Sequence, residues 1–165
     1  MRGIKIAHVV YTFGTALFAG LLYTFEQGVI PSLKQLSGPE YVKVEQMLIR
    51  ALDGRPVSVI VVATLSMLLP LYPLIALRKE RATPFWRWTM VGWVLFCFGV
   101  SVYTIVLNVP VNNAVLAMDA AHPPDTWVAM RDRWNLLNLI RTPINYLSLI
   151  AYLIAGLNGV PQPKA

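Results

Sequence analysis

The chain has 165 residues, of which 56% are hydrophobic and 13% are charged. A soluble domain carries about 25% charged residues, so this composition excludes an ordinary soluble protein. The net charge of +6 comes from basic residues that flank apolar segments, which indicates orientation in a membrane and argues against a nucleic-acid partner.

Four apolar windows follow one another along the chain, at residues 6–30, 57–77, 88–111 and 137–157. As a helix, each is long enough to cross a hydrocarbon core of about 30 Å. The first window is too long for the apolar stretch of a secretory signal peptide and has no clear cleavage site, so we expect it to be retained. The sequence therefore predicts an all-α fold, a four-helix transmembrane bundle that occupies residues 1–165 as a single domain.

The connection after the first window has the pattern of a short amphipathic helix. Ser37 and Glu40 resemble a capping box, in which the two side chains satisfy free backbone groups at a helix start. An apolar stripe follows at helical spacing, made of Tyr41, Val44, Leu48 and Ala51 or Leu52. We expect this helix to lie on the membrane surface.

The connection before the last window carries a second amphipathic segment. Pro123 and Pro124 break the chain, and Asp125 then sits in the first turn of a helix, where negative charge is favourable. Trp127 and Trp134 suit the interface between membrane and water. This segment either stops short of the last window or runs straight into it.

Orientation follows from the positions of lysine and arginine. The short connection between the second and third windows, from Arg78 to Arg87, is densely basic, and Arg2 and Lys5 lie at the N-terminus. The two long connections mix basic with acidic residues. The positive-inside rule therefore predicts that both termini are cytoplasmic, and the expected location is a bacterial inner membrane.

Two charged residues fall inside the windows, Glu26 in the first and Arg141 in the last. The predicted orientation places both near the outer ends of their helices. Because an unpaired charge in hydrocarbon is costly, we expect the two to form an ion pair. The pair is either a clasp that holds the bundle together or part of a polar cavity. The cavity would also contain four amide side chains, those of Asn108, Asn112, Asn113 and Asn138.

Histidine and cysteine are too sparse to predict a metal site. His8 and His122 lie at opposite ends of the predicted bundle, and Cys97 is the single cysteine, which matches no known zinc pattern. His122 is either an ordinary loop residue or a proton-transfer group beside the outer polar cluster. Neither a metal nor a cofactor is predicted.

A specific run of polar residues, Asn108-Val109-Pro110-Val111-Asn112-Asn113, is followed by Trp134, Asn138 and Arg141-Thr142. This pattern resembles that of the DUF1772 or anthrone oxygenase-like membrane proteins. The resemblance implies a small four-helix membrane protein, and some fungal relatives oxidise an anthrone to an anthraquinone with molecular oxygen. Leu139 departs from the pattern, because some relatives carry a histidine at that position.

The resemblance also implies a chemistry for these residues. The methylene group of an anthrone is acidic, so a base could produce a carbanion that reacts with molecular oxygen as co-substrate. Glu26 or His122 would be the base, and Arg141 with Asn108, Asn112 and Asn138 would stabilise the oxyanion. Trp134 and Tyr23 would stack on the flat ring.

A second reading is a non-catalytic protein, either an accessory subunit of a larger membrane complex or a module that binds lipid or a quinone. Small residues on the helix surfaces favour docking to neighbouring helices. In this reading the expected partners are membrane lipid, an aromatic or quinone-like molecule, further copies of the chain or larger subunits. A transporter is a third option, but four helices without repeats suit alternating access poorly.

Overall fold

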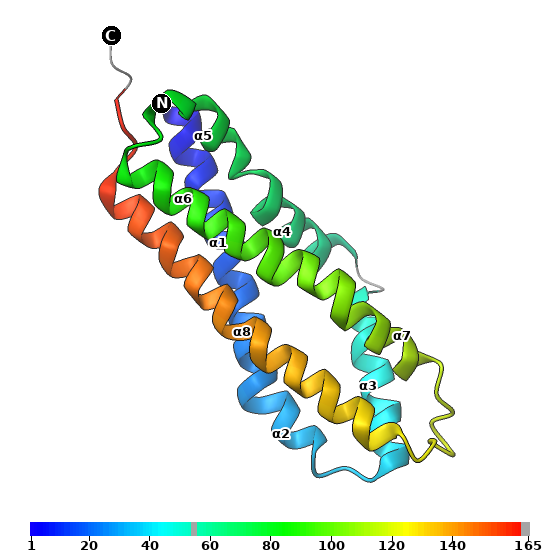
Figure 1. The fold of residues 1–165 in the computed structure, drawn as a ribbon. Coiled ribbons are helices and arrows are strands. Elements are labelled where there is room, and N and C mark those ends of the chain that lie inside the picture. The colour runs from blue at the N-terminus through cyan, green and yellow to red at the C-terminus, as the bar shows by residue number, and fades with distance from the viewer. Residues whose placement is uncertain (54–55, 163–165) are drawn as a thin grey trace.

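The computed structural model describes residues 1–53 and 56–162, and every regular element in these two ranges is a helix (Figure 1). Within these ranges four helical stretches are long and apolar enough to cross a membrane: Arg2–Leu33, Val59–Ala76, Pro84–Leu116 and Trp127–Asn158. The predicted all-α four-span architecture is therefore confirmed. Three of the four stretches are longer than the apolar windows that predicted them.

The first and second stretches are each built from shorter helices. The first joins α1 (Arg2–Thr24) through a π-helical turn to α2 (Ile30–Leu33). After a short loop, α3 (Gly38–Asp53) leads back towards the chain termini, followed by α4 (Pro56–Leu68) and α5 (Leu71–Ala76). Together, α3, α4 and α5 bring the chain back along the bundle to the end at which it began.

The third and fourth stretches complete the bundle. The third contains α6 (Pro84–Val94), two π-helical segments and α7 (Val109–Leu116), and the fourth is the uninterrupted helix α8 (Trp127–Asn158). The amphipathic segment at Trp127 therefore runs straight into the last span. Both termini lie at one end, here called the terminal end, while α2, α3 and α7 lie at the opposite, far end (Figure 1).

The predicted helix after the first span is confirmed as α3, together with its capping interaction. The backbone N–H and the hydroxyl of Ser37 both donate to Glu40 Oε2, at 3.1 and 2.6 Å. Its buried face differs from the predicted stripe, because Glu45 and Gln46 are buried with Tyr41. The Nε2 of Gln46 donates to the backbone carbonyls of Val115, near the end of the third stretch, and of Met118, just after it, each at 2.9 Å. Helix α3 is thereby fixed into the bundle wall.

Two of the π-helical turns precede a proline. Pro31 follows the turn Phe25–Val29, and Pro110 follows the turn Thr104–Asn108. Proline has no N–H to donate to the carbonyl four residues earlier, and a π-helical turn widens the backbone where that hydrogen bond is missing. Each wide turn changes the rotation of the residues beyond it, which matters for the side chains that face the interior.

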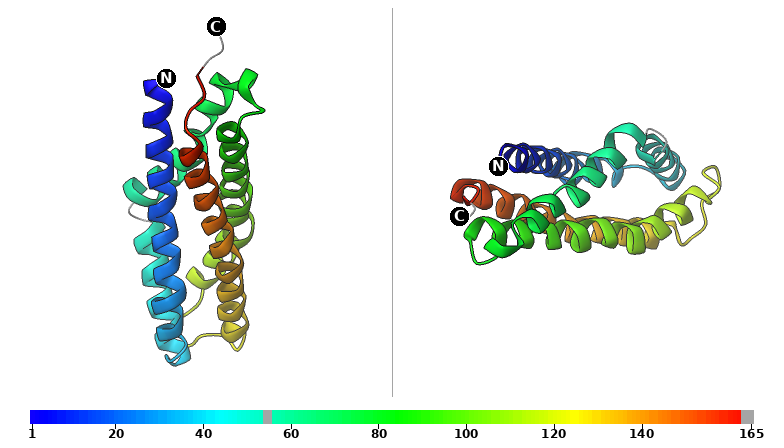
Figure 2. Two further views of the ribbon diagram at one scale, coloured as in Figure 1. Left: turned by 90° about the vertical axis from the view of Figure 1, so that its left-hand side faces the viewer. Right: turned by 90° about the horizontal axis from the view of Figure 1, so that it is seen from above.

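Helices α6 and α8 approach closely at the terminal half, where they run side by side with α1 (Figure 2). The Ser148 hydroxyl donates to the backbone oxygen of Gly92 at 2.8 Å. A Cβ atom at Gly92 would lie 2.6 Å from the ring of Tyr152, so this contact requires glycine. Close approach through small residues is a common way for membrane helices to pack.

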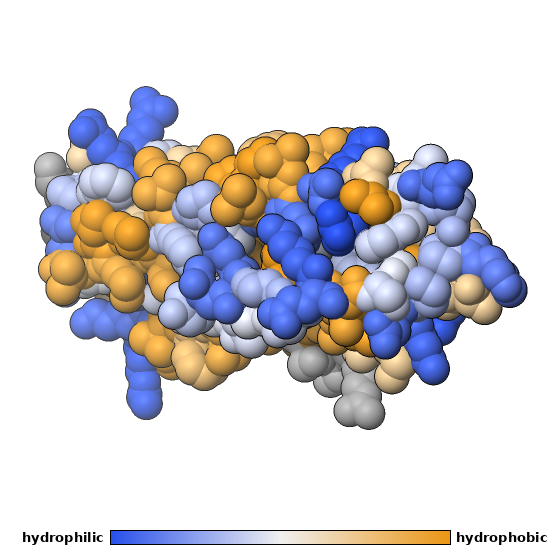
Figure 3. All heavy atoms as spheres, turned by 90° about the horizontal axis from the view of Figure 1, so that it is seen from below, coloured by the Kyte–Doolittle hydropathy of each residue, from blue (hydrophilic) through white to orange (hydrophobic). Residues whose placement is uncertain are grey.

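The outward-facing surface of the spans is apolar. Val9, Phe13 and Ile105 are exposed, as are many other large hydrophobic side chains of the spans. A space-filling view shows broad hydrophobic areas, with hydrophilic residues gathered at the ends and over part of the middle (Figure 3). This surface is that of an integral membrane protein, in which lipid covers the apolar sides.

Candidate active site

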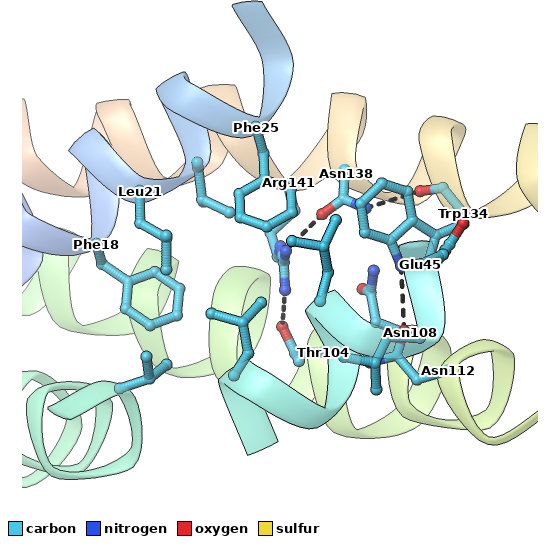
Figure 4. A pocket seen from close by; sticks show the side chains of 15 residues that line it. Phe18, Leu21, Phe25, Glu45, Thr104, Asn108, Asn112, Trp134, Asn138 and Arg141 are labelled. Atoms are coloured by element: carbon cyan, nitrogen blue, oxygen red, sulfur yellow. Dashed lines mark hydrogen bonds between the residues drawn. The ribbon is translucent and has the colours of Figure 1, made fainter. Parts of the chain in front are cut away.

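A cavity of about 130 Å³ lies inside the far half of the bundle. One end is apolar, with Phe18 and Leu21 of α1, whereas the other end is polar (Figure 4). The polar lining comes from helices far apart in the sequence, namely Glu45 of α3, Thr104, Asn108 and Asn112 of the third stretch, and Trp134, Asn138 and Arg141 of α8. Such an amphiphilic space suits a ligand with a polar head and an apolar body.

Arg141 is held in place by two side chains. Its Nη1 donates to Thr104 Oγ1 at 2.7 Å, and its Nη2 donates to Asn138 Oδ1 at 2.5 Å. The Thr104 hydroxyl in turn donates to the Val100 carbonyl at 2.6 Å. The π-helical turn Thr104–Asn108 therefore supplies one of the two acceptors that aim the guanidinium.

The guanidinium of Arg141 has no carboxylate within 4.0 Å among residues 1–53 and 56–162. Within the part of the chain that the structure describes, its Nε is buried without a hydrogen-bond partner, and so is Oδ1 of Asn108 on the same cavity. A buried cation without a counter-ion is unfavourable. The positive charge and its free donor therefore make the polar end of the cavity a natural site for an anion.

A hydrogen-bonded chain along α8 extends from Arg141 to the aromatic wall of the cavity. The Nδ2 of Asn138 donates to the Trp134 carbonyl at 2.9 Å, and the Trp134 indole N–H donates to Asn112 Oδ1 at 3.1 Å. The Trp134 ring also packs at a tilt against Phe25, with 6.0 Å between ring centroids. Both aromatic rings are thus fixed beside the guanidinium.

Glu45 is the carboxyl group that shares the cavity with Arg141. Its side chain is 1% exposed, and neither carboxyl oxygen has a hydrogen-bond partner within the described part of the chain. Burial raises its pKa from the ordinary 4.5 to about 7, against a smaller opposing influence of the neighbouring Tyr41 hydroxyl. A carboxyl group in this state can both accept and return a proton near neutral pH.

The predicted ion pair between Glu26 and Arg141 is wrong. No such pair exists among the residues that the structure describes, and Glu26 instead lines a separate depression with Lys34 and Asp132. The cavity-facing residue at this level of the first stretch is Phe25. Successive residues of a helix point about 100° apart, so Glu26 is turned away from the guanidinium.

The other predicted site residues separate into two groups. Tyr23, Asn113 and His122 are exposed, and none of them lines the cavity. The His122 ring lies 3.3 Å from the Asp119 carboxylate at the surface, so His122 is placed outside the cavity, away from Arg141. The residues that do line the cavity are Asn108, Asn112, Trp134, Asn138 and Arg141.

Glu45 is absent from the stripe predicted for the buried face of α3, because that stripe consists of apolar residues alone. Tyr41, Glu45 and Ile49 follow one another at steps of four, and all three are buried. Residues four apart lie on one face of a helix. The position of Glu45 between two large apolar residues at this spacing is the sequence signal that it is buried.

The family of the chain is decided by its match to the model of the anthrone oxygenase family, which covers residues 50–152. The chain belongs to the anthrone oxygenase family. The matched range contains most of the cavity's polar lining, including Thr104, Asn138 and Arg141, whereas Glu45 lies just before it. The comparisons with curated proteins and with solved structures gave no match for this anthrone oxygenase family member.

Proposed function

We propose that the chain is a membrane oxygenase that acts on a flat aromatic substrate with an acidic C–H group, in the cavity between Arg141 and Glu45. The observation that carries the proposal is the pairing of two incomplete groups. Arg141 is a guanidinium without an anion, and Glu45 is a buried carboxyl without hydrogen-bond partners, both within the described residues. Membership of the anthrone oxygenase family supports the reaction type.

The two groups suit the removal of a proton from carbon beside an aromatic ketone. Glu45 in its carboxylate form accepts the proton from the methylene group of the substrate. The negative charge then moves to the substrate oxygen, where the guanidinium of Arg141 stabilises it. Thr104 and Asn138 hold the guanidinium in place, so little reorganisation is needed when the charge develops.

The remaining steps balance with molecular oxygen as the oxidant. The carbanion transfers electrons to oxygen and forms a carbon–oxygen bond, and the resulting peroxide anion takes the proton back from Glu45. The carboxylate then removes the second methylene proton while the O–O bond breaks. The methylene becomes a carbonyl, the departing hydroxide takes up a proton as water, and one molecule of oxygen is consumed for each quinone and each water formed.

The flat shape of the substrate follows from the aromatic walls. Trp134 and Phe25 line the cavity together with Arg141, and their rings are fixed by the Asn112 hydrogen bond and by mutual packing. Aromatic rings favour offset stacked or tilted neighbours. This role was predicted for Tyr23, but Phe25 is the residue that lines the cavity.

The test is oxygen consumption and quinone formation by the purified protein with anthrone, in the presence of a metal chelator. We expect the wild-type chain to convert anthrone to anthraquinone and Glu45→Gln to lose turnover while it still binds the product. Glu26→Gln is the matched control, because Glu26 lies outside the cavity, and it should keep wild-type activity. Binding of anthraquinone without any oxygen consumption would favour a quinone-binding module instead.

For the membrane orientation, we propose that the terminal end faces the cytoplasm. Arg2, Lys5 and the basic connection Arg78–Arg87 supply positive charge at this end, and the positive-inside rule relates such charge to the cytoplasmic side. The polar end of the cavity would then lie in the outer half of the membrane.

A further inference from the structure

An apolar groove lies between α1 and α4, beside the cavity. It has a volume of about 150 Å³ and is lined by Leu17, Phe18 and Leu21 of α1 and by Val59 and Val62 of α4. None of these side chains can donate or accept a hydrogen bond. The groove therefore favours an apolar group, either a lipid chain or the apolar part of a ligand.

The groove and the cavity share three of their lining residues, Phe18, Leu21 and Val59. Phe18 and Leu21 lie at the end of the cavity that is remote from Trp134 and Asn112 (Figure 4). The Phe18 ring packs edge-on against Phe96, with 5.8 Å between centroids. The cavity and the groove thus adjoin at the apolar end of the cavity. The lining side chains change from polar beside the guanidinium to apolar in the groove.

Size decides what the groove adds. The cavity measures about 130 Å³, which is close to the roughly 150 Å³ of an engineered protein cavity that holds one benzene molecule. The space beside Arg141 therefore accommodates about one ring. A fused system of three rings has to extend further, and the groove is the adjoining space.

The surroundings of the groove indicate how such a molecule would arrive. Leu17 at its edge is 49% exposed, and Phe13 and Ile60 nearby on α1 and α4 are exposed as well. These side chains belong to membrane-spanning stretches, so acyl chains surround the groove.

We infer that the α1–α4 groove holds one outer ring of the substrate, whose central, reactive ring lies between Arg141 and Glu45. The fused-ring ketone of the proposed function then reaches the cavity from the acyl region of the membrane, sideways between α1 and α4. This inference rests on the proposed function for the identity of the reactive ring. The existence of the groove does not depend on the proposed function.

The experiment measures binding, without turnover, by equilibrium dialysis of the detergent-solubilised full chain against protein-free micelles. The probes are anthraquinone, with three rings, and acetophenone, with one ring and one carbonyl. Leu17→Trp fills the groove, and its half-exposed position tolerates bulk. Ile60→Trp is the control, because Ile60 lies on α4, is exposed and lines neither space.

We expect Leu17→Trp to weaken anthraquinone binding by about tenfold or more, since the displaced outer ring loses contacts worth more than two buried methylene groups. Acetophenone binding should stay at the wild-type level, and Ile60→Trp should change neither probe. Leu17→Phe, a smaller block, should give an intermediate loss and serves if the tryptophan variant does not fold.

Two results would overturn the inference: anthraquinone binding that is unchanged in both Leu17 variants, or equal losses for both probes. The proposed function fails in a different way. If anthraquinone binding depends on Leu17 but the wild-type chain consumes no oxygen with anthrone, the groove inference stands and the oxygenase proposal is rejected.

Discussion

Arg141 and Glu45 line the same cavity from two different helices, α8 and α3, without forming an ion pair in the described part of the chain. A direct pair would satisfy both charges and leave little reason for a ligand to bind. The separation keeps the guanidinium free for an anion and the carboxyl free for a proton.

Replacement of Arg141 separates a catalytic role from a structural clasp. We expect Arg141→Gln to lower kcat by about 100-fold or more, the usual effect of losing a group that stabilises an oxyanion. Thermal stability in detergent should hold or rise, because the variant removes a buried charge without a counter-ion. A clasp would show the reverse, with normal turnover in a less stable protein.

Arg141→Lys extends this test. Lysine keeps the charge but has no planar fork with which to reach Thr104 and Asn138 together. We therefore expect turnover close to that of Arg141→Gln. Full activity of the lysine variant would mean that charge alone is sufficient and that the two hydrogen bonds do not orient the group.

The protonation of Glu45 predicts how activity varies with pH. Its pKa is raised to about 7, and the carboxylate is the form that removes the substrate proton. We expect kcat/KM for anthrone oxidation to rise with pH through about 7 and then to level off. A profile that is flat across neutral pH in the wild-type chain would contradict the role of Glu45 as the base.

The raised pKa of Glu45 also predicts that the stability of the folded chain falls as the pH rises, whereas activity rises. Its pKa is about 7 when folded and near the ordinary 4.5 when unfolded, so the folded chain binds more protons between these values. The stabilisation is fully present below the unfolded pKa and is lost as the pH rises through the folded pKa, to an extent of about 3 kcal/mol. Thermal unfolding of wild type and Glu45→Gln across this range measures it, and the variant should lack this contribution.

The contact between α6 and α8 predicts a position that tolerates no side chain. In Gly92→Ala the new Cβ would meet the buried ring of Tyr152 at 2.6 Å, and overpacking of this kind costs about 1–3 kcal/mol. Gly20→Ala is the matched control, because no atom of the described residues lies within 4 Å of a Cβ there. We expect a lower unfolding temperature for Gly92→Ala but not for Gly20→Ala. Equal unfolding temperatures of the two variants would show that α6 and α8 can move apart without loss of stability.

The proposed orientation predicts the labelling of introduced cysteines in intact cells. In a Cys97→Ala background, Ala121→Cys in the α7–α8 connection should react with a membrane-impermeant maleimide. Arg81→Cys in the basic connection should react only after the cells are permeabilised. Both positions are exposed, so the opposite pattern would place the termini outside.

Much of the fold was already determined by local sequence. Four apolar windows dictate four spans because helices that satisfy their own backbone are stable in hydrocarbon, and Ser37 with Glu40 fixes the start of α3. Arg141 was recognisable as a functional residue because a charge within an apolar helix is costly. The set of cavity residues on α8 also followed from helical spacing, since Trp134, Asn138 and Arg141 recur at steps of four and three.

Only the tertiary structure decided which carboxyl group shares a cavity with Arg141. Periodicity shows which residues lie on a common face of one helix, but the rotation of that face depends on the neighbours against which the helix packs. Packing of the first stretch directs Phe25 into the cavity and leaves Glu26 outside it, while Gln46 fixes α3 so that Glu45 points inward. Local sequence determines the helices of this protein, whereas contacts between helices determine its chemistry.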